Sequence, residues 1–180
     1  MIYIRHSEKL YKNCENTEFS LDPGLTDNGK IQAVIKFNDL LKYGIPDVIY
    51  CSPYLRTRET ALIAQCCIKQ KTNIDVNIMV DILLGEYLGN QIDVNLDTAL
   101  HQETLIYQPL KPEKWDEYTN RIKKHIELNK IINKKQDKMI WYISHGIVIQ
   151  SIAYFSGTKI KYPSPLSGFI KKNNIISQII

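Results

Sequence analysis

Met1-Ile2-Tyr3-Ile4-Arg5-His6 is the stretch that decides the fold of this chain. Its first four residues are apolar or aromatic and include two β-branched isoleucines, which predicts a short buried strand. Arg5 and His6 stand where that strand would end. Ligands of open α/β sheets bind beyond the carboxyl ends of the strands, so a cation beside an imidazole there indicates an anion site. The dipeptide alone is weak evidence, and by itself it favours a surface arginine beside a hydrogen-bonded histidine.

Two further predicted strands lead into residues of the same chemistry. Residues 47–51 predict a buried strand, followed by a helix that carries Arg56 in or near its first turn. Residues 139–143 predict another buried strand, which leads through a serine to His145. A helix N-terminus favours anions through its free N–H groups and its dipole, and Arg56 adds a forked positive charge there. Arg5, Arg56 and His145 are therefore expected at one edge of a sheet.

Predicted strands and helices alternate along the chain. A further strand is expected over residues 73–80, helices over 27–43, 113–135 and 147–155, and two short final strands over 168–180. This alternation predicts an α/β fold, a three-layer α/β/α sandwich around a mostly parallel sheet.

The helix expected over residues 27–43 carries two more specific predictions. Thr26 can act as its N-cap, and Gly29, a poor helix former, is expected to be there for close packing. The buried face is expected to follow the apolar stripe of this helix, which consists of Ile31, Val34, Ile35, Leu40 and Leu41.

Three later segments join Arg5-His6 in an ordered set of motifs. They are Leu25-Thr26-Asp27-Asn28-Gly29-Lys30-Ile31-Gln32-Ala33, Cys51-Ser52-Pro53-Tyr54-Leu55-Arg56-Thr57-Arg58-Glu59-Thr60-Ala61 and Ile143-Ser144-His145-Gly146. Their order and spacing resemble the histidine phosphatase superfamily, also called phosphoglycerate mutase-like. Its pattern runs Arg-His-Gly, Leu-Thr-x-x-Gly-x-x-Gln-Ala, Ser-Pro-x-x-Arg-x-x-x-Thr-Ala and Ser-His-Gly. Ser7 departs from this pattern where many members have Gly, but it is small enough for the backbone to pass close to a phosphate.

The resemblance implies a phosphoglycerate mutase-like fold and a metal-independent phosphatase that hydrolyses phosphomonoesters. It implies that His6 is the nucleophile and forms a phosphohistidine. Arg5, Arg56 and His145 are implied as the phosphate-binding residues, with His145 also catalytic. No cofactor and no metal ion are expected, because side chains supply the positive charge.

The proton donor is assigned from a shorter match. Leu83-Leu84-Gly85-Glu86 corresponds to the family's Leu-x-Glu segment, which implies that Glu86 protonates the leaving group and later activates water. The spacing from Glu86 to Gly89 is one residue shorter than in many members. His145-Gly146, in place of His-Asp, points away from the acid phosphatase and phytase branch.

Two alternatives stay open from the sequence. One is a phosphotransferase of the phosphoglycerate mutase type, for which residues 90–112 could serve as a lid. The other is a non-catalytic phosphate-binding module of the same fold, suggested by the basic last third of the chain. In every case we expect a single domain over residues 1–180, with residues 90–112 as an excursion over the active site.

Composition sets the class of protein and of partner. The chain has 180 residues, 44% hydrophobic and 23% charged, with a formal net charge of +4, as in an ordinary globular domain. Residues 118–180 contain 11 Lys or Arg but only 2 Asp or Glu, which would attract anionic partners. The expected partner is a phosphorylated small molecule or a phosphoprotein, not a nucleic acid or a membrane, and the sequence carries no signal for an oligomeric state.

The four cysteines lack the spacing of a disulfide framework or of a zinc site. Together with the lack of a signal peptide or a membrane-length apolar run, they predict free thiols in a cytoplasmic protein.

Overall fold

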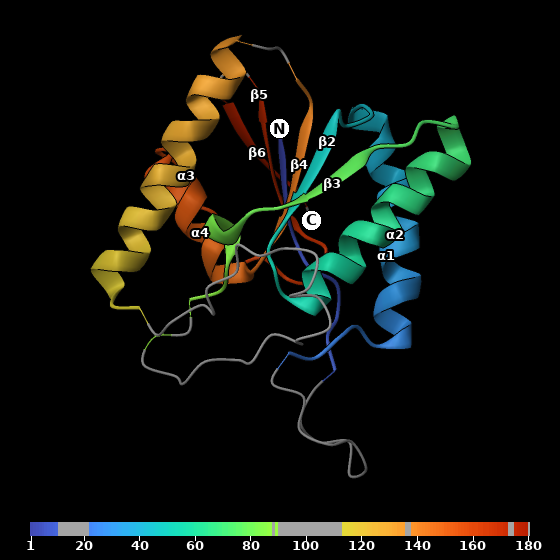
Figure 1. The fold of residues 1–180 in the computed structure, drawn as a ribbon, viewed down its shortest axis with the longest axis horizontal. Helices are drawn as coiled ribbons and strands as arrows, with labels where there is room; N and C mark the ends of the chain where they lie inside the picture. Colours follow the sequence, from blue (N-terminus) through green and yellow to red (C-terminus); the bar gives the residue numbers. More distant parts are fainter. Residues whose placement is uncertain (11–21, 88, 90–112, 136–137, 173–174, 180) are drawn as a thin grey trace.

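The computed structural model describes residues 1–10, 22–87, 89, 113–135, 138–172 and 175–179. The excursion expected over residues 90–112 lies outside this described part. The elements, in order, are β1 (Ile2–Arg5), α1 (Asp27–Leu40), η1 (Leu41–Tyr43), β2 (Val48–Cys51), α2 (Leu55–Thr72), β3 (Asn77–Val80), η2 (Ile82–Leu84), α3 (Trp115–Lys135), β4 (Ile140–Ser144), α4 (Gly146–Phe155), β5 (Gly168–Lys172) and β6 (Ile175–Ile179) (Figure 1).

The strands form one six-stranded sheet in the order β3-β2-β4-β1-β5-β6. The pairs β3–β2, β2–β4 and β4–β1 are parallel, whereas β5 and β6 join as an antiparallel extension. The predicted α/β class with a mostly parallel sheet is therefore confirmed. The carboxyl ends of β1, β2 and β4 lie at the same edge, which is where the sequence placed Arg5, Arg56 and His145.

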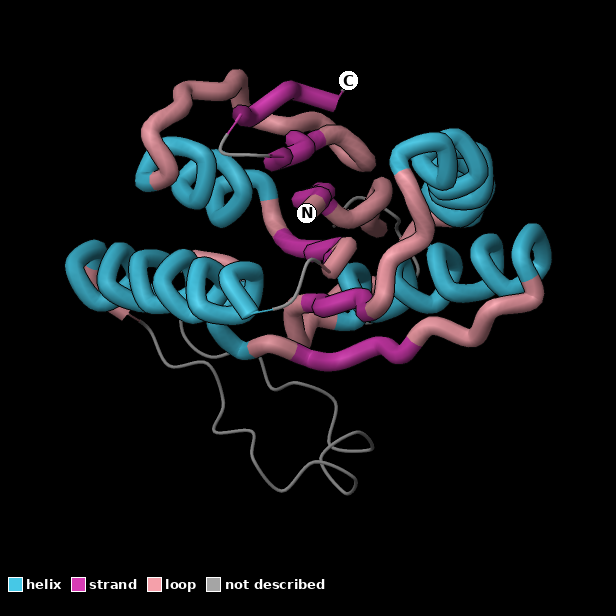
Figure 2. Tube along the Cα trace, turned by 90° about the horizontal axis from the view of Figure 1, so that it is seen from above, coloured by secondary structure: helices cyan, strands magenta, loops and turns pink. Residues whose placement is uncertain are grey.

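Helices cover both faces of the sheet, as the sandwich prediction required (Figure 2). Helices α1 and α2 pack together on one face, and α3 and α4 pack together on the other. In the part of the chain that the structure describes, no helix is both long enough and apolar enough to cross a membrane.

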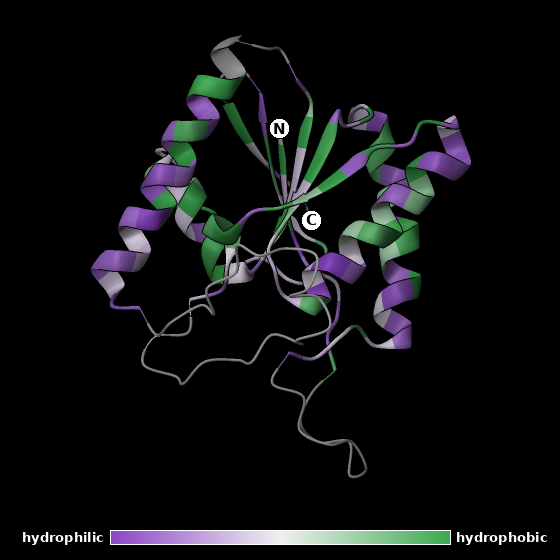
Figure 3. Cartoon of the chain, viewed as in Figure 1, coloured by the Kyte–Doolittle hydropathy of each residue, from purple (hydrophilic) through white to green (hydrophobic). Residues whose placement is uncertain are grey.

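Strand β1 supplies side chains to both cores by simple alternation. Ile2 and Ile4 join the core under α1 and α2, while Tyr3 points to the opposite core and stacks on Tyr142 and Phe169 at centroid distances of 4.5 and 4.7 Å. Burying each of these large side chains stabilises the fold by about 1.5–3 kcal/mol. Hydrophobic residues accordingly dominate the strands (Figure 3).

The buried face of α1 differs from the predicted stripe. Ile31, Val34 and Ile35 are 62%, 43% and 66% exposed, so this part of the prediction is wrong. The buried residues of the helix are Gly29, Ala33, Phe37 and Leu40. Two of these are small, which allows α1 to approach its neighbours closely, and an apolar pattern alone does not reveal such a face.

Gly29 is where α1 meets the segment that follows His6. A Cβ atom at this position would lie 2.4 Å from the carbonyl oxygen of Glu8, which itself accepts a hydrogen bond from the Thr26 N–H at 3.0 Å. Thr26 also caps the helix, as predicted, by accepting a hydrogen bond from the Gly29 N–H at 2.8 Å. Gly29 therefore allows the backbone beyond His6 to lie against the start of α1.

Gly29→Ala should lower the free energy of unfolding by about 1–3 kcal/mol, because the added methyl group meets backbone that cannot turn away. Helix propensity alone predicts the opposite sign, a gain of about 0.5–1 kcal/mol. Urea unfolding of the variant measures the difference, with Gln32→Ala on the exposed face of α1 as the control. A Gly29→Ala protein as stable as the wild type, or more so, would contradict the close contact.

Candidate active site

His6 follows β1 directly and is almost fully buried, with 2% of its surface exposed. Its backbone N–H donates to Ser144 O at 2.9 Å, which continues the pairing of β1 with β4. In the side chain, Nδ1 lies 2.6 Å from the carbonyl oxygen of Ser7. A carbonyl oxygen can only accept a hydrogen bond, so Nδ1 carries the proton of the neutral ring. Nε2 is left with its lone pair.

The surroundings keep this ring neutral. Burial first, and then the positive charge of Arg56, lower the pKa of His6 to about 3, although its hydrogen bond to Ser7 opposes the shift. Arg5 and Lys9 add smaller effects in the same direction. An uncharged imidazole with a lone pair is what a nucleophile requires.

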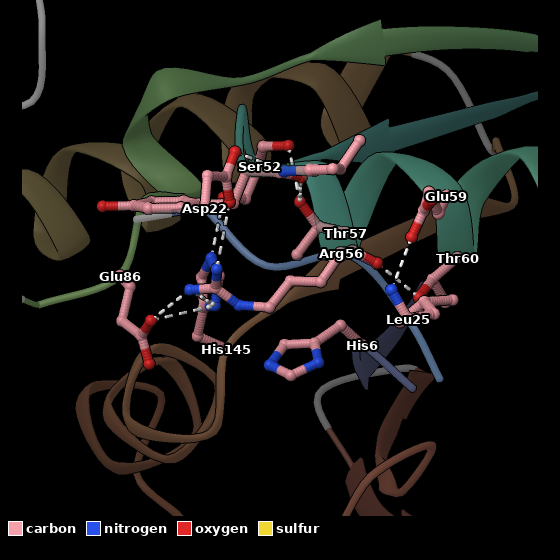
Figure 4. A network of polar contacts seen from close by, with 12 residues as sticks. His6, Asp22, Leu25, Ser52, Arg56, Thr57, Glu59, Thr60, Glu86 and His145 are labelled. Carbon is pink, nitrogen blue, oxygen red and sulfur yellow. Dashed lines mark hydrogen bonds and ion pairs between the residues drawn. The ribbon is translucent and has the colours of Figure 1, made fainter. Parts of the chain in front are cut away.

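Arg56 is the second residue of α2 and is 2% exposed. Its Nη1 donates to Asp22 Oδ1 at 3.2 Å, its Nη2 pairs with Glu86, and its Cζ lies 4.5 Å from the ring centroid of Tyr54. The guanidinium is thus held by a carboxylate on either side and by an aromatic face (Figure 4). Asp22 also accepts from the Leu55 N–H at 2.8 Å, so one carboxylate fixes both the start of α2 and Arg56.

His145 follows β4 and is fully buried. Its Nε2 lies 2.8 Å from Ser52 Oγ, and its ring centroid is 5.4 Å from that of His6. Nδ1 lies 3.4 Å from Arg56 Nη2 and 3.7 Å from Glu86 Oε2. Burial, then the charge of Arg56, hold the pKa of His145 well below its usual range. Because the Ser52 hydroxyl can donate or accept, it supports either tautomer of this histidine.

The structure brings together four of the five predicted site residues. One region at the sheet edge is surrounded by His6, Arg56, Glu86 and His145 (Figure 4). The Arg56 guanidinium lies between Glu86 and His6. The fifth residue, Arg5, has its guanidinium bonded to a backbone carbonyl group instead of to another site residue. Its Nη1 donates to Pro163 O at 2.9 Å, although its charge still lowers the pKa values of both histidines.

Sequence reasoning missed several residues of this site. Asp22 belongs to none of the four motifs, yet it is only 8% exposed and binds Arg56. Ser52 and Tyr54 support His145 and Arg56 from within the third motif. Lys9 is half-buried, and burial followed by the nearby Arg56 lowers its pKa. A lysine three residues after His6 was the available signal for a further cation.

Within the described residues, no group of three or more His, Cys, Asp or Glu side chains is arranged to hold a metal ion. The positive charge here comes from guanidinium and ammonium groups, which bind the oxygens of a tetrahedral anion by charge-assisted hydrogen bonds.

Comparison with known proteins gives a family and a fold. The family described as "Histidine phosphatase superfamily (branch 1)" matches residues 1–167. No curated protein matches the chain. Many solved structures match the chain. Those named below are 16–18% identical to it, so they show its fold and not its function.

Three of these structures show the range of functions on this fold. The ecdysone phosphate phosphatase of Bombix mori has a TM-score of 0.69 and 17% identity, covering 99% of this chain and 90% of its own. The alpha-ribazole phosphatase of Shigella flexneri has a TM-score of 0.65 and 18% identity, covering 99% and 93%. The phosphoglycerate mutase of Bacillus anthracis has a TM-score of 0.66 and 16% identity, covering 99% and 90%. The predicted phosphoglycerate mutase-like fold is therefore confirmed.

The lowered pKa of His6 predicts a pH-dependent stability. Below the ordinary pKa of about 6.5, the unfolded chain takes up a proton at this residue that the folded protein does not bind until about pH 3. The free energy of unfolding should therefore fall as the pH drops from about 6.5, by at most about 1.4 kcal/mol per pH unit from this group.

Urea unfolding at pH 7 and pH 5 measures this loss, and His6→Gln should reduce it because glutamine does not titrate. An equal loss in the wild type and in His6→Gln would show that His6 has no lowered pKa in the folded protein.

Proposed function

The chain belongs to the histidine phosphatase superfamily, and on that premise we propose that it is a metal-independent phosphomonoesterase that works through a phosphohistidine on His6. The single observation that carries the proposal is the buried His6, whose Nδ1–H is committed to Ser7 and whose pKa is lowered to about 3. In the neutral ring, Nε2 therefore carries the lone pair, close to Arg56 and His145. A module that only bound phosphate would gain nothing from this arrangement.

In the first step, the substrate phosphate binds to Arg56 and His145, with Arg5 and Lys9 adding positive charge from farther away. Nε2 of His6 attacks phosphorus, and the bond from phosphorus to the ester oxygen breaks. Arginine and histidine donors stabilise the charge that spreads over the equatorial oxygens in the transition state. The entering phosphate monoanion brings one proton, which passes to the Glu86 carboxylate and from there to the departing alkoxide.

In the second step, a water molecule attacks the phosphohistidine. Glu86 now accepts a proton from this water, and the bond between phosphorus and Nε2 breaks to release inorganic phosphate. The ion pair of Glu86 with Arg56 places the carboxylate beside the guanidinium that would bind the phosphate, within reach of both proton transfers. A bound phosphate would share the guanidinium with Glu86.

The substrate class in this proposal is a phosphorylated small molecule or a phosphoprotein. Relatives of the same fold are described as phosphatases of ecdysone phosphate and of alpha-ribazole phosphate, which supports hydrolysis of small phosphate esters. A cytoplasmic location is part of the proposal. It is supported by the described cysteines Cys51, Cys66 and Cys67, which are free thiols.

Hydrolysis of an aryl phosphate in the presence of excess chelator tests the metal-independent reaction. We expect full activity with and without chelator, and loss of activity in Arg56→Gln because the phosphate loses its main cation. Activity that disappears on chelation and returns with added divalent metal would contradict the proposal.

A mutase of the same family would transfer the phosphoryl group back to a substrate hydroxyl instead of to water. One similar structure is a phosphoglycerate mutase, so this alternative is measured directly. With phosphoglycerate as substrate, we expect release of phosphate or no reaction. Isomerisation faster than phosphate release would identify a mutase.

Glu86→Gln should slow phosphoryl transfer from alkyl phosphates by about 10²–10⁴-fold. Transfer from aryl phosphates should slow much less, because a stable phenolate needs little protonation as it leaves. Single-turnover measurement of phosphoenzyme formation separates this step from hydrolysis of the phosphohistidine. Equal slowing for both leaving groups would exclude Glu86 as the leaving-group acid.

A further inference from the structure

The segment that carries Glu86 lies outside the sheet. Strand β3 ends at Val80, and the chain then passes through the short 3-10 helix η2 (Ile82–Leu84) and Gly85 to reach Glu86. After the Asp81 N–H, which donates to Cys51 O at 2.8 Å, neither strand pairing nor a long helix holds this stretch. Backbone carbonyl groups in such a segment need partners from elsewhere in the protein.

Three consecutive carbonyl oxygens directly before Glu86 have side-chain partners. Arg121 Nη1 donates to Leu83 O at 2.7 Å and to Gly85 O at 3.0 Å. Between them, Leu84 O accepts from Ser144 Oγ at 2.7 Å. Ser144 is the last residue of β4, so the Glu86 segment is tied both to α3 and to the strand that ends at His145.

Arg121 is itself fixed in place. Its Nε donates to Glu113 Oε2 at 3.0 Å, and Nη2 pairs with the other oxygen of the same carboxylate. Its Cζ lies 5.2 Å from the ring centroid of Tyr118. The side chains of Arg121 and Glu113 are only 13% and 18% exposed. A forked ion pair of this kind holds the guanidinium plane more firmly than a single contact would.

The next turn of α3 holds the start of the same segment. His125 Nδ1 lies 3.1 Å from Asp81 Oδ2, while Asp81 Oδ1 accepts from the Leu83 N–H at 2.9 Å. His125 follows Arg121 by four residues and therefore lies on the same face of the helix. Helix α3 thus fastens both ends of the stretch from Asp81 to Gly85.

We propose that Arg121 is a positioning residue for the proton donor: it grips the backbone on either side of Leu84 and so sets where the Glu86 carboxyl stands relative to the phosphate. The inference rests on the proposed role of Glu86. Among the described residues, Arg121 donates hydrogen bonds to Glu113 and to the carbonyl groups of Leu83 and Gly85, not to the Glu86 carboxylate. It acts through two carbonyl groups, and its effect is confined to the proton transfers that Glu86 performs.

Placement matters because a general acid has to be within hydrogen-bonding reach of the atom that it protonates. A displacement of about 1 Å can cost about 10²-fold in rate. Arg121→Gln removes the guanidinium group and its charge. Arg121→Lys keeps the charge but cannot pair with both oxygens of Glu113 at once. Lys124→Gln is the matched control, since it removes one positive charge from an exposed position on the same helix.

The test is the rate of phosphoenzyme formation in single turnovers, measured with an alkyl and an aryl phosphate for each variant. Their ratio within one protein does not depend on how much of the sample is folded. We expect Arg121→Gln to slow the alkyl substrate by about 10–10²-fold with little change for the aryl one. Arg121→Lys should be intermediate, and Lys124→Gln should match the wild type.

A double variant makes the assignment specific. If Arg121 acts only through Glu86, Arg121→Gln should add no further loss with the alkyl substrate once Glu86→Gln is present. Equal slowing of both substrates by Arg121→Gln, or a full additional loss in the double variant, would overturn the inference and leave an ordinary structural residue.

The same data separate this inference from the proposed function. If Glu86→Gln slows the alkyl substrate more than the aryl one but Arg121→Gln does not, only the positioning role of Arg121 is excluded. If Glu86→Gln lacks the effect, the proton donor is misassigned, and the positioning role falls with it.

Discussion

The parallel register of β1 against β4 is the constraint on which the site depends. Arg5 pairs with Ser144 in this register, so the next residues, His6 and His145, leave the sheet side by side. Their ring centroids are 5.4 Å apart. A slip of one residue would turn the side chains of β1 to the opposite faces, exchanging Tyr3 with its isoleucine neighbours, and would separate the two rings. The two buried cores that hold the register therefore also hold the site geometry.

The positive charge beside the two histidines is fixed in place by two carboxylates. Arg56 is buried and lies between two carboxylates, Asp22 and Glu86. A buried guanidinium without these partners would carry a large desolvation cost. With them, it stays in place next to His6, where burial first and then this charge lower the pKa of the ring. In the proposed reaction, phosphate binding and the neutral state of His6 depend on the same arginine.

Much of this architecture could be predicted from the sequence, because strand ends in a parallel sheet converge. The alternation of strands and helices predicted the sandwich. The positions of His6, Arg56 and His145 after predicted strands, in the order of the family motifs, predicted that these residues lie at one edge of the sheet. Gly29 was expected to serve close packing, and its contact with the Glu8 carbonyl gives the reason. The predictions that succeeded depend on the alternation of strands and helices, on the order of the motifs and on the residues at the start of α1.

Other features depend on three-dimensional contacts that no local pattern encodes. The exposed Ile31 and Ile35 look like a buried stripe, yet small residues on another face of α1 decide the packing. Asp22 is 34 residues from Arg56 in the sequence, so no local pattern predicts their ion pair. The sequence likewise does not predict that Arg121 supports the Glu86 segment, since its hydrogen bonds go from a helix distant in sequence to backbone carbonyl groups.

In the proposed reaction, His6 attacks through Nε2 because Ser7 holds the proton on Nδ1. The most direct measurement is to trap the phosphoenzyme with a good substrate and identify the phosphorylated atom by phosphorus and nitrogen NMR of the intact protein. We expect one phosphoryl group, on Nε2 of His6, and none in His6→Ala. A phosphoryl group on Nδ1 of His6, or on any other residue, would contradict it.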